Sequence, residues 1–285
     1  MSIALQVALV MVTILVVLLV IGAPIGVAIG MSSAVSMICM IPADVSFATS
    51  AQRIFAGSNS FSLIAIPFFI LAGNIMNNGG IATRLVNCAK VISGRMPGAL
   101  AQSNVVANML FGAISGSGAA AAAAMGGTIG PLEEKEGYDK NYSTAVNVAS
   151  APVGMLIPPS NTMIVYSSVA GSVSIAALFM AGYIPGLLWG GAVMILAGIM
   201  AKKRGYQAEQ RVPVKVALKT FWQAIPSLLL IVIVIGGILG GIFTATEGSA
   251  IAVVYATVLS LIYKAFKIKD IPRIVLEAAK TTGII

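Results

Sequence analysis

The sequence contains no histidine, two cysteines and few charged residues for its length. Asp, Glu, Lys and Arg make up 9% of its 285 residues, whereas soluble domains carry about 25%. A chain with so little charge cannot cover a surface that faces water, so we expect it in a lipid bilayer. The missing histidine excludes His-based acid–base catalysis and, with only Cys39 and Cys88, a Cys/His metal site. An enzyme is therefore not expected.

Long stretches without charge make up most of the chain. They cover residues 2–43, 54–83, 96–132, 141–201, 220–246 and 248–263. Because a crossing helix needs about 20 apolar residues, the first and fourth stretches can each hold two crossings. A turn at 22–26, which contains Pro24, divides the first stretch. The second, fifth and sixth stretches are expected to cross once, which predicts an all-α, polytopic inner-membrane protein.

The stretch 96–132 is longer than one crossing requires and too short for two crossings with a turn. In its middle, Ser115-Gly116-Ser117-Gly118 interrupts a helical apolar pattern, and an alanine run restarts it at Ala119. Serine and glycine are residues that let a helix stop at membrane depth. We therefore predict a re-entrant hairpin that returns to its own side.

The basic residues support this topology. If the hairpin returns to its own side, Arg53 is the one residue of the 17 Lys and Arg that lies on the opposite face from the others. Cytoplasmic loops are rich in Lys and Arg, so the N-terminus is predicted to be periplasmic. If 96–132 crossed instead, the division would be less uneven. The net charge of +8 is thus interpreted as a topology signal and not as a nucleic-acid surface.

Two pairs of helices enter the membrane from opposite sides in this topology. The pair that ends near Met40 starts outside, and the pair in 220–263 starts in the cytoplasm. Such pairs are typical of an inverted-topology repeat. The second repeat is largely absent, so we expect the chain to be a fragment that lacks the second half of a site.

A second break lies in the crossing 141–171. Pro158 and Pro159 remove two backbone donors in succession and disfavour helix before them, so the crossing must unwind there. In lipid, the freed carbonyl groups need protein, water or a cation, and a sodium ion suits such hard oxygen ligands. The helices that restart near Ala119 and Asn161 point their N-termini into the breaks, which favours an anion. Close helix packing and a simple proline kink are the structural alternatives.

Several side chains near the breaks have expected roles. Ser160 and Asn161 are good N-caps whose side chains are also able to donate hydrogen bonds to a carboxylate. Asn108 is expected either to support the hairpin tip or to form a helix–helix hydrogen bond. Glu247 is expected to cap a helix. The acidic residues from Glu133 to Asp139 are expected in a solvated cytoplasmic loop.

Four motifs together resemble a known family. They are Ala-Ile-Pro-Phe-Phe-Ile-Leu-Ala-Gly-Asn at 65–74, the tip at 115–118, Leu-Ile-Pro-Pro-Ser-Asn at 156–161 and Ala-Leu-Phe-Met-Ala-Gly-Tyr-Ile-Pro-Gly at 177–186. Over its whole length the chain is similar to the large membrane (M) subunit of tripartite ATP-independent periplasmic (TRAP) transporters. The resemblance implies sodium-coupled import of an organic acid anion by an elevator mechanism. It also implies a small membrane (Q) subunit and a periplasmic substrate-binding protein as partners.

The resemblance also implies which residues form the site. The expected Na+ ligands are Ser115, Gly116, Ser117, Gly118, Gly154 and Pro158. The expected substrate-binding residues are Ser117, Ser160, Asn161 and Thr162. The tip sequence at 117–120 is similar to that of the sialic acid (N-acetylneuraminate) branch. The alternatives are a C4-dicarboxylate or other sugar-acid TRAP permease, and a divalent-anion/sodium symporter that needs no binding protein.

An elevator mechanism implies a division into moving and fixed parts. Residues 1–83 and 224–285 are expected to be scaffold helices. The amphipathic segments 84–97 and 202–223 are expected to be an arm and a linker along the lipid headgroups, with ordinary loops as the alternative. The expected transport domain is 98–201, with a hairpin at 98–132, a broken helix at 141–171 and a helix at 174–200.

Overall fold

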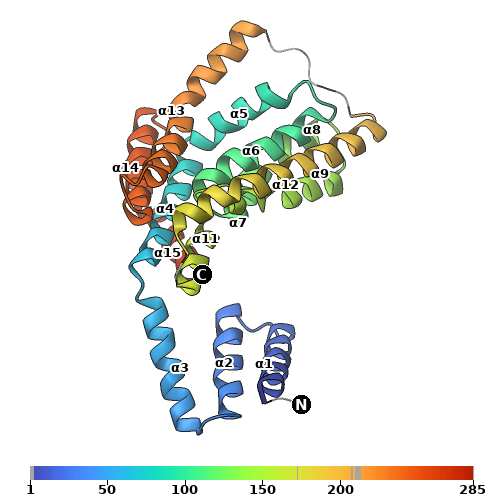
Figure 1. The fold of residues 1–285 in the computed structure, drawn as a ribbon. Helices are drawn as coiled ribbons and strands as arrows, with labels where there is room; N and C mark the ends of the chain where they lie inside the picture. Colours follow the sequence, from blue (N-terminus) through green and yellow to red (C-terminus); the bar gives the residue numbers. More distant parts are fainter. Residues whose placement is uncertain (1–2, 172, 207, 209–212, 285) are drawn as a thin grey trace. The chain divides into compact units, whose positions relative to one another are not determined.

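The structure is a computed structural model that describes the whole chain except residues 1–2, 172, 207, 209–212 and 285 (Figure 1). All regular structure in the described residues is helical, as the sequence predicts. The α-helices are α1 (Ile3–Val20), α2 (Ile25–Ile38), α3 (Ala43–Ser58), α4 (Ala65–Asn78), α5 (Ile81–Ser93), α6 (Ala99–Ser115), α7 (Gly118–Thr128), α8 (Gly130–Lys135), α9 (Lys140–Ser150), α10 (Val153–Leu156), α11 (Asn161–Ala170), α12 (Ile175–Lys203), α13 (Val214–Leu239), α14 (Ala245–Ile262) and α15 (Ile271–Ile284). Two short 3-10 helices are η1 (Phe61–Ile64) and η2 (Ile268–Asp270).

The lengths and composition of the helices confirm a polytopic membrane protein. Within the described part of the chain, 5 helical segments are long and apolar enough to cross a membrane: α1, η1 with α4, α12, α13 and α14. The helices α9 to α11 form a sixth span if they are counted as one crossing, bent by 48°. The second crossing expected in 2–43 is shorter than predicted. Because α2 has 14 residues, it rises only about 21 Å, less than the hydrocarbon core.

The chain divides into two units, residues 1–60 and 61–284. In the first unit, α1 has no buried residue, which suits a lipid-facing helix. The predicted turn separates α1 from α2, which begins directly after Pro24. The buried hydroxyl of Ser46 on α3 donates a hydrogen bond to the carbonyl of Ala34 on α2, at 2.7 Å. This bond fixes α3 against α2.

The second unit has a core formed by α4 to α6 with α9, α13 and α14. In Figure 1, α6 lies between α5 and α12, and it contacts both. Most of its side chains are buried, although its sequence is less apolar than that of α12. The side-chain amide of Gln102 on α6 donates a hydrogen bond to the carbonyl oxygen of Met194 on α12, at 2.8 Å. The hydroxyl of Tyr142 on α9 donates to the carbonyl oxygen of Ala197, also on α12, at 2.8 Å. These bonds join the hairpin and the broken helix to α12.

The described parts of the two predicted amphipathic segments are mainly helical. The first forms α5, which begins at Ile81 and ends at Ser93. Its apolar side chains, such as Leu85, pack against α6 and α13 and are buried in protein. The second lies in part outside the described residues, and from Val214 onward it belongs to the long helix α13. Amphipathicity alone does not distinguish a helix buried on one face by protein from one that lies on lipid.

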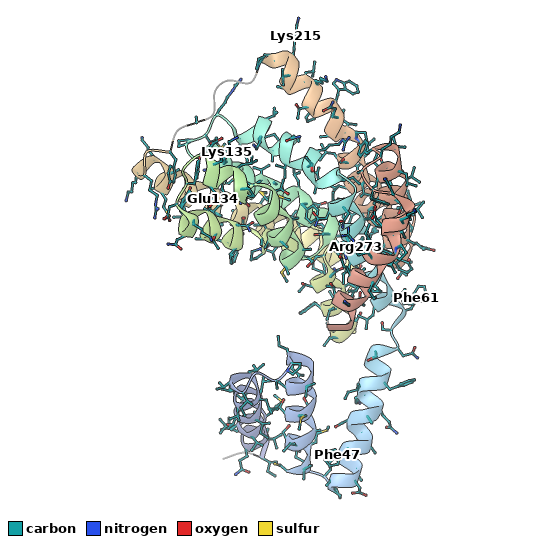
Figure 2. The ribbon with its side chains drawn as sticks, turned by 180° about the vertical axis from the view of Figure 1, so that it is seen from behind. Phe47, Phe61, Glu134, Lys135, Lys215 and Arg273 are labelled. Carbon is teal, nitrogen blue, oxygen red and sulfur yellow. The ribbon has the colours of Figure 1, made fainter. Side chains whose placement is uncertain are left out.

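The acidic segment after the hairpin differs from the predicted solvated loop. It forms the short helix α8 and a turn. Glu134 and Lys135 are exposed, and Figure 2 shows them and Lys215 toward one end of the second unit, with Phe61 toward the other. Glu133 is buried, with only 1% of its surface exposed. The prediction of a fully solvated segment was therefore wrong for Glu133.

Candidate functional site

The two predicted breaks meet in the second unit. α6 ends at Ser115, Gly116 has φ +62°, and α7 begins at Gly118. The backbone N–H of Asn161 donates a hydrogen bond to the carbonyl oxygen of Gly116, at 3.2 Å. A side chain at Gly116 would place Cβ 3.0 Å from the carbonyl oxygen of Pro159. Glycine therefore supplies both the left-handed backbone and the space that the contact needs.

Two helices begin at this junction, and a serine caps each. The Ser117 hydroxyl accepts a hydrogen bond from the backbone N–H of Ala120, at 3.3 Å. The Ser160 hydroxyl accepts from Met163 at 3.4 Å and donates to the carbonyl of Met155. The predicted restart points and the Ser160 cap are thus confirmed. The Ser160 hydroxyl is buried, and it both donates a hydrogen bond to the backbone and accepts one from it. In this conformation its hydrogen-bonding groups are therefore used by the backbone.

Close contact between glycines fixes the hairpin against the broken helix. A Cβ at Gly112 would lie 2.2 Å from Cα of Gly154, so α6 and α10 touch through their backbones. This places Gly154 about one helical turn before the Ser115 end of α6. A Cβ at Gly118 would lie 3.2 Å from the carbonyl oxygen of Ala151. No larger residue fits at these positions without movement of the backbone.

A cavity of about 250 Å³ opens beside the tip. It is lined by Ile70, Gly73, Asn74, Ser115, Ser117, Ala119, Ala120 and Thr281. The sequence had not indicated Asn74 as a site residue. The signal was present, since Asn74 is the one amide in the otherwise apolar run 63–76, and polar groups inside membrane segments are usually functional. Helix α4 therefore contributes to the site together with the hairpin.

Thr162 and Pro158 lie apart from this cavity. Thr162 lines a different pocket of about 440 Å³, between the broken helix and α12, whose other members are mainly apolar, such as Met155 and Tyr166. Pro158 is buried, and its peptide bond to Pro159 is cis. Of the expected substrate-binding residues, the structure therefore places Ser117 beside the tip cavity and Asn161 in contact with the tip, but Thr162 on another face.

Asn108 joins two helices. Its side chain is buried on α6, and its amide nitrogen lies 3.0 Å from Oδ1 of Asn147 and 2.7 Å from Oγ of Ser150, both on α9. The same nitrogen is 2.9 Å from Oδ1 of Asn104. The helix–helix hydrogen bond expected for Asn108 is thus confirmed, and the residue holds the hairpin against the broken helix.

The oxygen atoms at the junction suit an alkali cation. Oδ1 of Asn161 is buried and, within the described part of the chain, has no hydrogen-bond partner. Buried polar atoms are nearly always paired, so an unpaired oxygen in this position is available to a ligand. Carbonyl, amide and hydroxyl oxygens are hard ligands of the kind that Na+ accepts. The N-termini of α7 and α11 favour an anion close by.

The sequence matches the family model described as the tripartite ATP-independent periplasmic transporter, DctM component, over residues 12–285. The chain belongs to this family. TRAP permeases are transporters and not enzymes, and the chain is accordingly a multi-pass membrane protein of a bacterial TRAP system.

Named relatives differ in substrate. The chain is 51% identical to the uncharacterized protein YgiK of Salmonella typhimurium, over 89% of this chain and 58% of that one. It is 37% identical to the C4-dicarboxylate TRAP transporter large permease protein DctM of Rhodobacter capsulatus, covering 83% and 57%. It is 38% identical to the sialic acid TRAP transporter large permease protein SiaM of Vibrio cholerae, covering 83% and 55%. The chain thus spans little more than half the length of these relatives.

Proposed function

We propose that the chain is part of a permease that imports an organic acid anion with sodium, using anion delivered by a periplasmic binding protein. The observation that carries this proposal is the hydrogen bond between Asn161 and Gly116, which brings two interrupted helices to one point. Broken helices that meet in the membrane interior, with carbonyl groups for a cation and N–H groups for an anion, are the general plan of secondary transporters. Membership of the DctM family supports the same function.

Sodium would bind where the two breaks touch. The free Oδ1 of Asn161, the backbone of the tip from Ser115 to Gly118 and the hydroxyl of Ser117 would supply the oxygen atoms. Gly154 and Pro158 would determine the conformation of the unwound segment. Gly154 allows close packing on α6, and Pro158 has no N–H for a helical hydrogen bond. The carboxylate of the substrate would lie at the N-termini of α7 and α11, near Ser117 and Asn161.

The moving part would be 98–201, between an arm at 84–97 and a linker at 202–223, on a scaffold of 1–83 and 224–285. The hydrogen bonds from Gln102, Asn108 and Tyr142 support this division, because they join the hairpin, the broken helix and α12 into one body. The N-terminus would be periplasmic. This orientation is supported by Lys135 and Lys215, which lie toward the same end of the second unit.

For the substrate, we propose sialic acid. Support comes from the small residues of the tip, Ser117-Gly118-Ala119-Ala120, and from the similarity to SiaM. The comparable similarity to DctM keeps a C4-dicarboxylate as the second candidate. Both are carboxylates, so the same helix N-termini would bind either one. A small membrane (Q) subunit and a periplasmic binding protein would complete the transporter.

Uptake by the full-length permease tests this function. The protein would be reconstituted in proteoliposomes with its Q subunit and binding protein, and labelled sialate and a labelled C4-dicarboxylate would be supplied with and without an inward Na+ gradient. We expect uptake of one anion that requires both the gradient and the binding protein. Uptake that is indifferent to sodium would contradict coupling. Uptake that needs no binding protein would instead indicate a divalent-anion/sodium symporter.

A further inference from the structure

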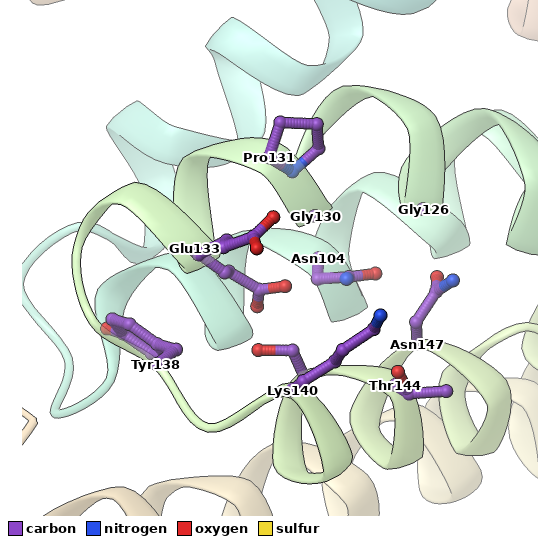
Figure 3. Close-up of a pocket in the computed structure, with 11 residues that line it drawn as sticks. Asn104, Gly126, Gly130, Pro131, Glu133, Tyr138, Lys140, Thr144 and Asn147 are labelled. Atoms are coloured by element: carbon purple, nitrogen blue, oxygen red, sulfur yellow. The ribbon is translucent and has the colours of Figure 1, made fainter.

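A second polar cavity lies in the second unit, away from the hairpin tip. It has a volume of about 390 Å³ and is formed by α6, α8, α9 and the C-terminal end of α7 (Figure 3). It is lined by Asn104, Gly126, Gly130, Pro131, Glu133, Glu134, Tyr138, Lys140, Ser143, Thr144 and Asn147. It shares no lining residue with the tip cavity. Its chemistry is therefore separate from the proposed sodium site.

Glu133 is the unusual member of this set. Only 1% of its surface is exposed, and its Oε1 has no hydrogen-bond partner among the described residues. Burial raises the pKa of Glu133 from 4.5 to about 7, and the nearby hydroxyl of Ser143 offsets only part of this effect. An ionised carboxylate is costly to bury without a partner, and the usual outcome is that the group takes up a proton.

The groups that face Glu133 are polar and mostly uncharged. Figure 3 shows the side chains of Glu133 and Asn104 directed into the same cavity. Oδ1 of Asn104 accepts a hydrogen bond from Asn108, whereas its Nδ2 is buried and unpaired in the described structure. The hydroxyl of Ser143 is near enough to Glu133 to lower its pKa, but it forms no hydrogen bond of normal geometry in the described structure. Unpaired donors and acceptors around one cavity are satisfied by water molecules.

No cation in the described residues neutralises Glu133. The helices α6 and α7, which pack against α8, carry no titratable side chain. The titratable groups on the other neighbouring segments are Glu134 and Lys135 on α8, Glu136, Tyr138 and Asp139 in the turn, Lys140 and Tyr142 on α9, and Arg204 and Tyr206 after α12. Lys140 is exposed and forms no ion pair with Glu133 within 4.0 Å. Arg204 is paired with Asp139, at 3.1 Å.

We propose that Glu133 is a proton-binding site, which is neutral while α8 is packed on α6 and α9 and which ionises by releasing its proton to water in the cavity. One O–H bond breaks and the proton passes to water, so no other reactant is needed. Ionisation draws water to α8 and weakens its packing against α6, since a carboxylate requires hydration that the protein does not supply. The packing of α8, which follows the hairpin helix α7, would thus depend on pH.

The direction of the effect follows from linkage. The pKa of Glu133 is higher in the folded protein than in an unfolded chain, so folding favours the protonated form. Its contribution to stability is complete below about pH 4.5 and falls as the pH rises to about 7. At higher pH, Glu133 no longer contributes to the stability of the fold, and the stability no longer depends on pH through this group.

Infrared spectroscopy of the full-length permease, with its partner subunit, tests this site. We would follow the absorption of protonated carboxyl groups from about pH 5 to about pH 9 and the unfolding temperature over the same range. The variants are Glu133→Gln and, as a control, Glu134→Gln, an exposed carboxyl on the same helix and cavity. We expect a carboxyl band with a midpoint near pH 7 that is absent from Glu133→Gln and retained in Glu134→Gln. The unfolding temperature should fall with pH in the wild type relative to Glu133→Gln.

Three results would overturn the proposal. They are a midpoint near pH 4.5, a band that persists in Glu133→Gln, and a midpoint that moves with Na+ concentration, because the last indicates a bound metal cation in place of the proton. If Glu133→Gln does not fold, Ser143→Ala gives a second test. It removes the hydroxyl that lowers the pKa of Glu133, so the midpoint should rise, and an unchanged midpoint contradicts the assignment. These measurements do not depend on transport, so they stand apart from the proposed function.

Discussion

The backbone N–H of Asn161 donates a hydrogen bond to the carbonyl oxygen of Gly116, at 3.2 Å. One bond thereby joins the tip of the hairpin to the unwound part of the neighbouring crossing. The N-termini of α7 and α11 and the free Oδ1 of Asn161 then lie at the same junction. Disturbing this contact should affect transport more than it affects folding.

Substitution of Gly116 tests the contact directly. Gly116 and Gly171 both have positive φ, +62° and +71°, so alanine carries a similar backbone cost of about 1 kcal/mol at either site. At Gly116 the new Cβ also meets Pro159, whereas at Gly171 it meets nothing within 4 Å. We expect Gly116→Ala to reduce sodium-driven uptake at least tenfold and Gly171→Ala to retain most of it. Equal uptake by the two variants, at equal amounts of protein, would speak against the junction.

The contact between Gly112 and Gly154 should be important for stability. A Cβ at Gly112 would lie 2.2 Å from Cα of Gly154, so Gly112→Ala forces α6 away from α10. Gly127 on α7 has nothing within 4 Å of its Cβ position, and Gly127→Ala is the matched control. We expect Gly112→Ala to lower the unfolding temperature by several degrees, since overpacking costs about 1–3 kcal/mol. An unfolding temperature like that of Gly127→Ala would show that the helices are not in close contact.

Asn108 should stabilise the pairing of α6 with α9. In Asn108→Ala, the acceptors on half-buried Asn147 and buried Ser150 lose their donor, at a cost of roughly 1–3 kcal/mol. Asn141→Ala, at an exposed position on α9, serves as the control and should change stability little. Thermal unfolding of the purified permease compares the two. Similar unfolding temperatures would mean that the hydrogen bonds of Asn108 contribute little to the pairing.

Ser117 should affect sodium binding in addition to capping a helix. Ser117→Ala and Ser174→Ala each remove an N-cap, which costs about 1 kcal/mol, but Ser174 caps α12 and lines neither the tip cavity nor the cavity around Glu133. Only Ser117→Ala should raise the Na+ concentration that gives half-maximal uptake, by about tenfold if one ligand is lost. If both variants show the wild-type sodium dependence, Ser117 is only a cap.

The breaks were predictable because their signals are local. Pro158 and Pro159 disfavour helix wherever they occur, and Ser115 to Gly118 interrupts an apolar run that is readable in the sequence. The burial of α5 was not predictable, since its apolar face suits α6 and α13 as well as lipid. The same holds for Glu133, which is followed in the sequence by the exposed charges of Glu134 and Lys135. Its burial is decided by contacts with α6, α7 and α9, and no local pattern contains that information.

Equilibrium binding of radiolabelled Na+ to the full-length permease tests the junction most directly. The wild type, Gly116→Ala and Gly171→Ala would be compared in detergent, with and without the transported anion. We predict saturable Na+ binding by the wild type and Gly171→Ala that the anion strengthens, and at least tenfold weaker binding by Gly116→Ala. Equal binding by all three proteins, or no saturable binding by the wild type, would contradict a sodium site where the two broken helices meet.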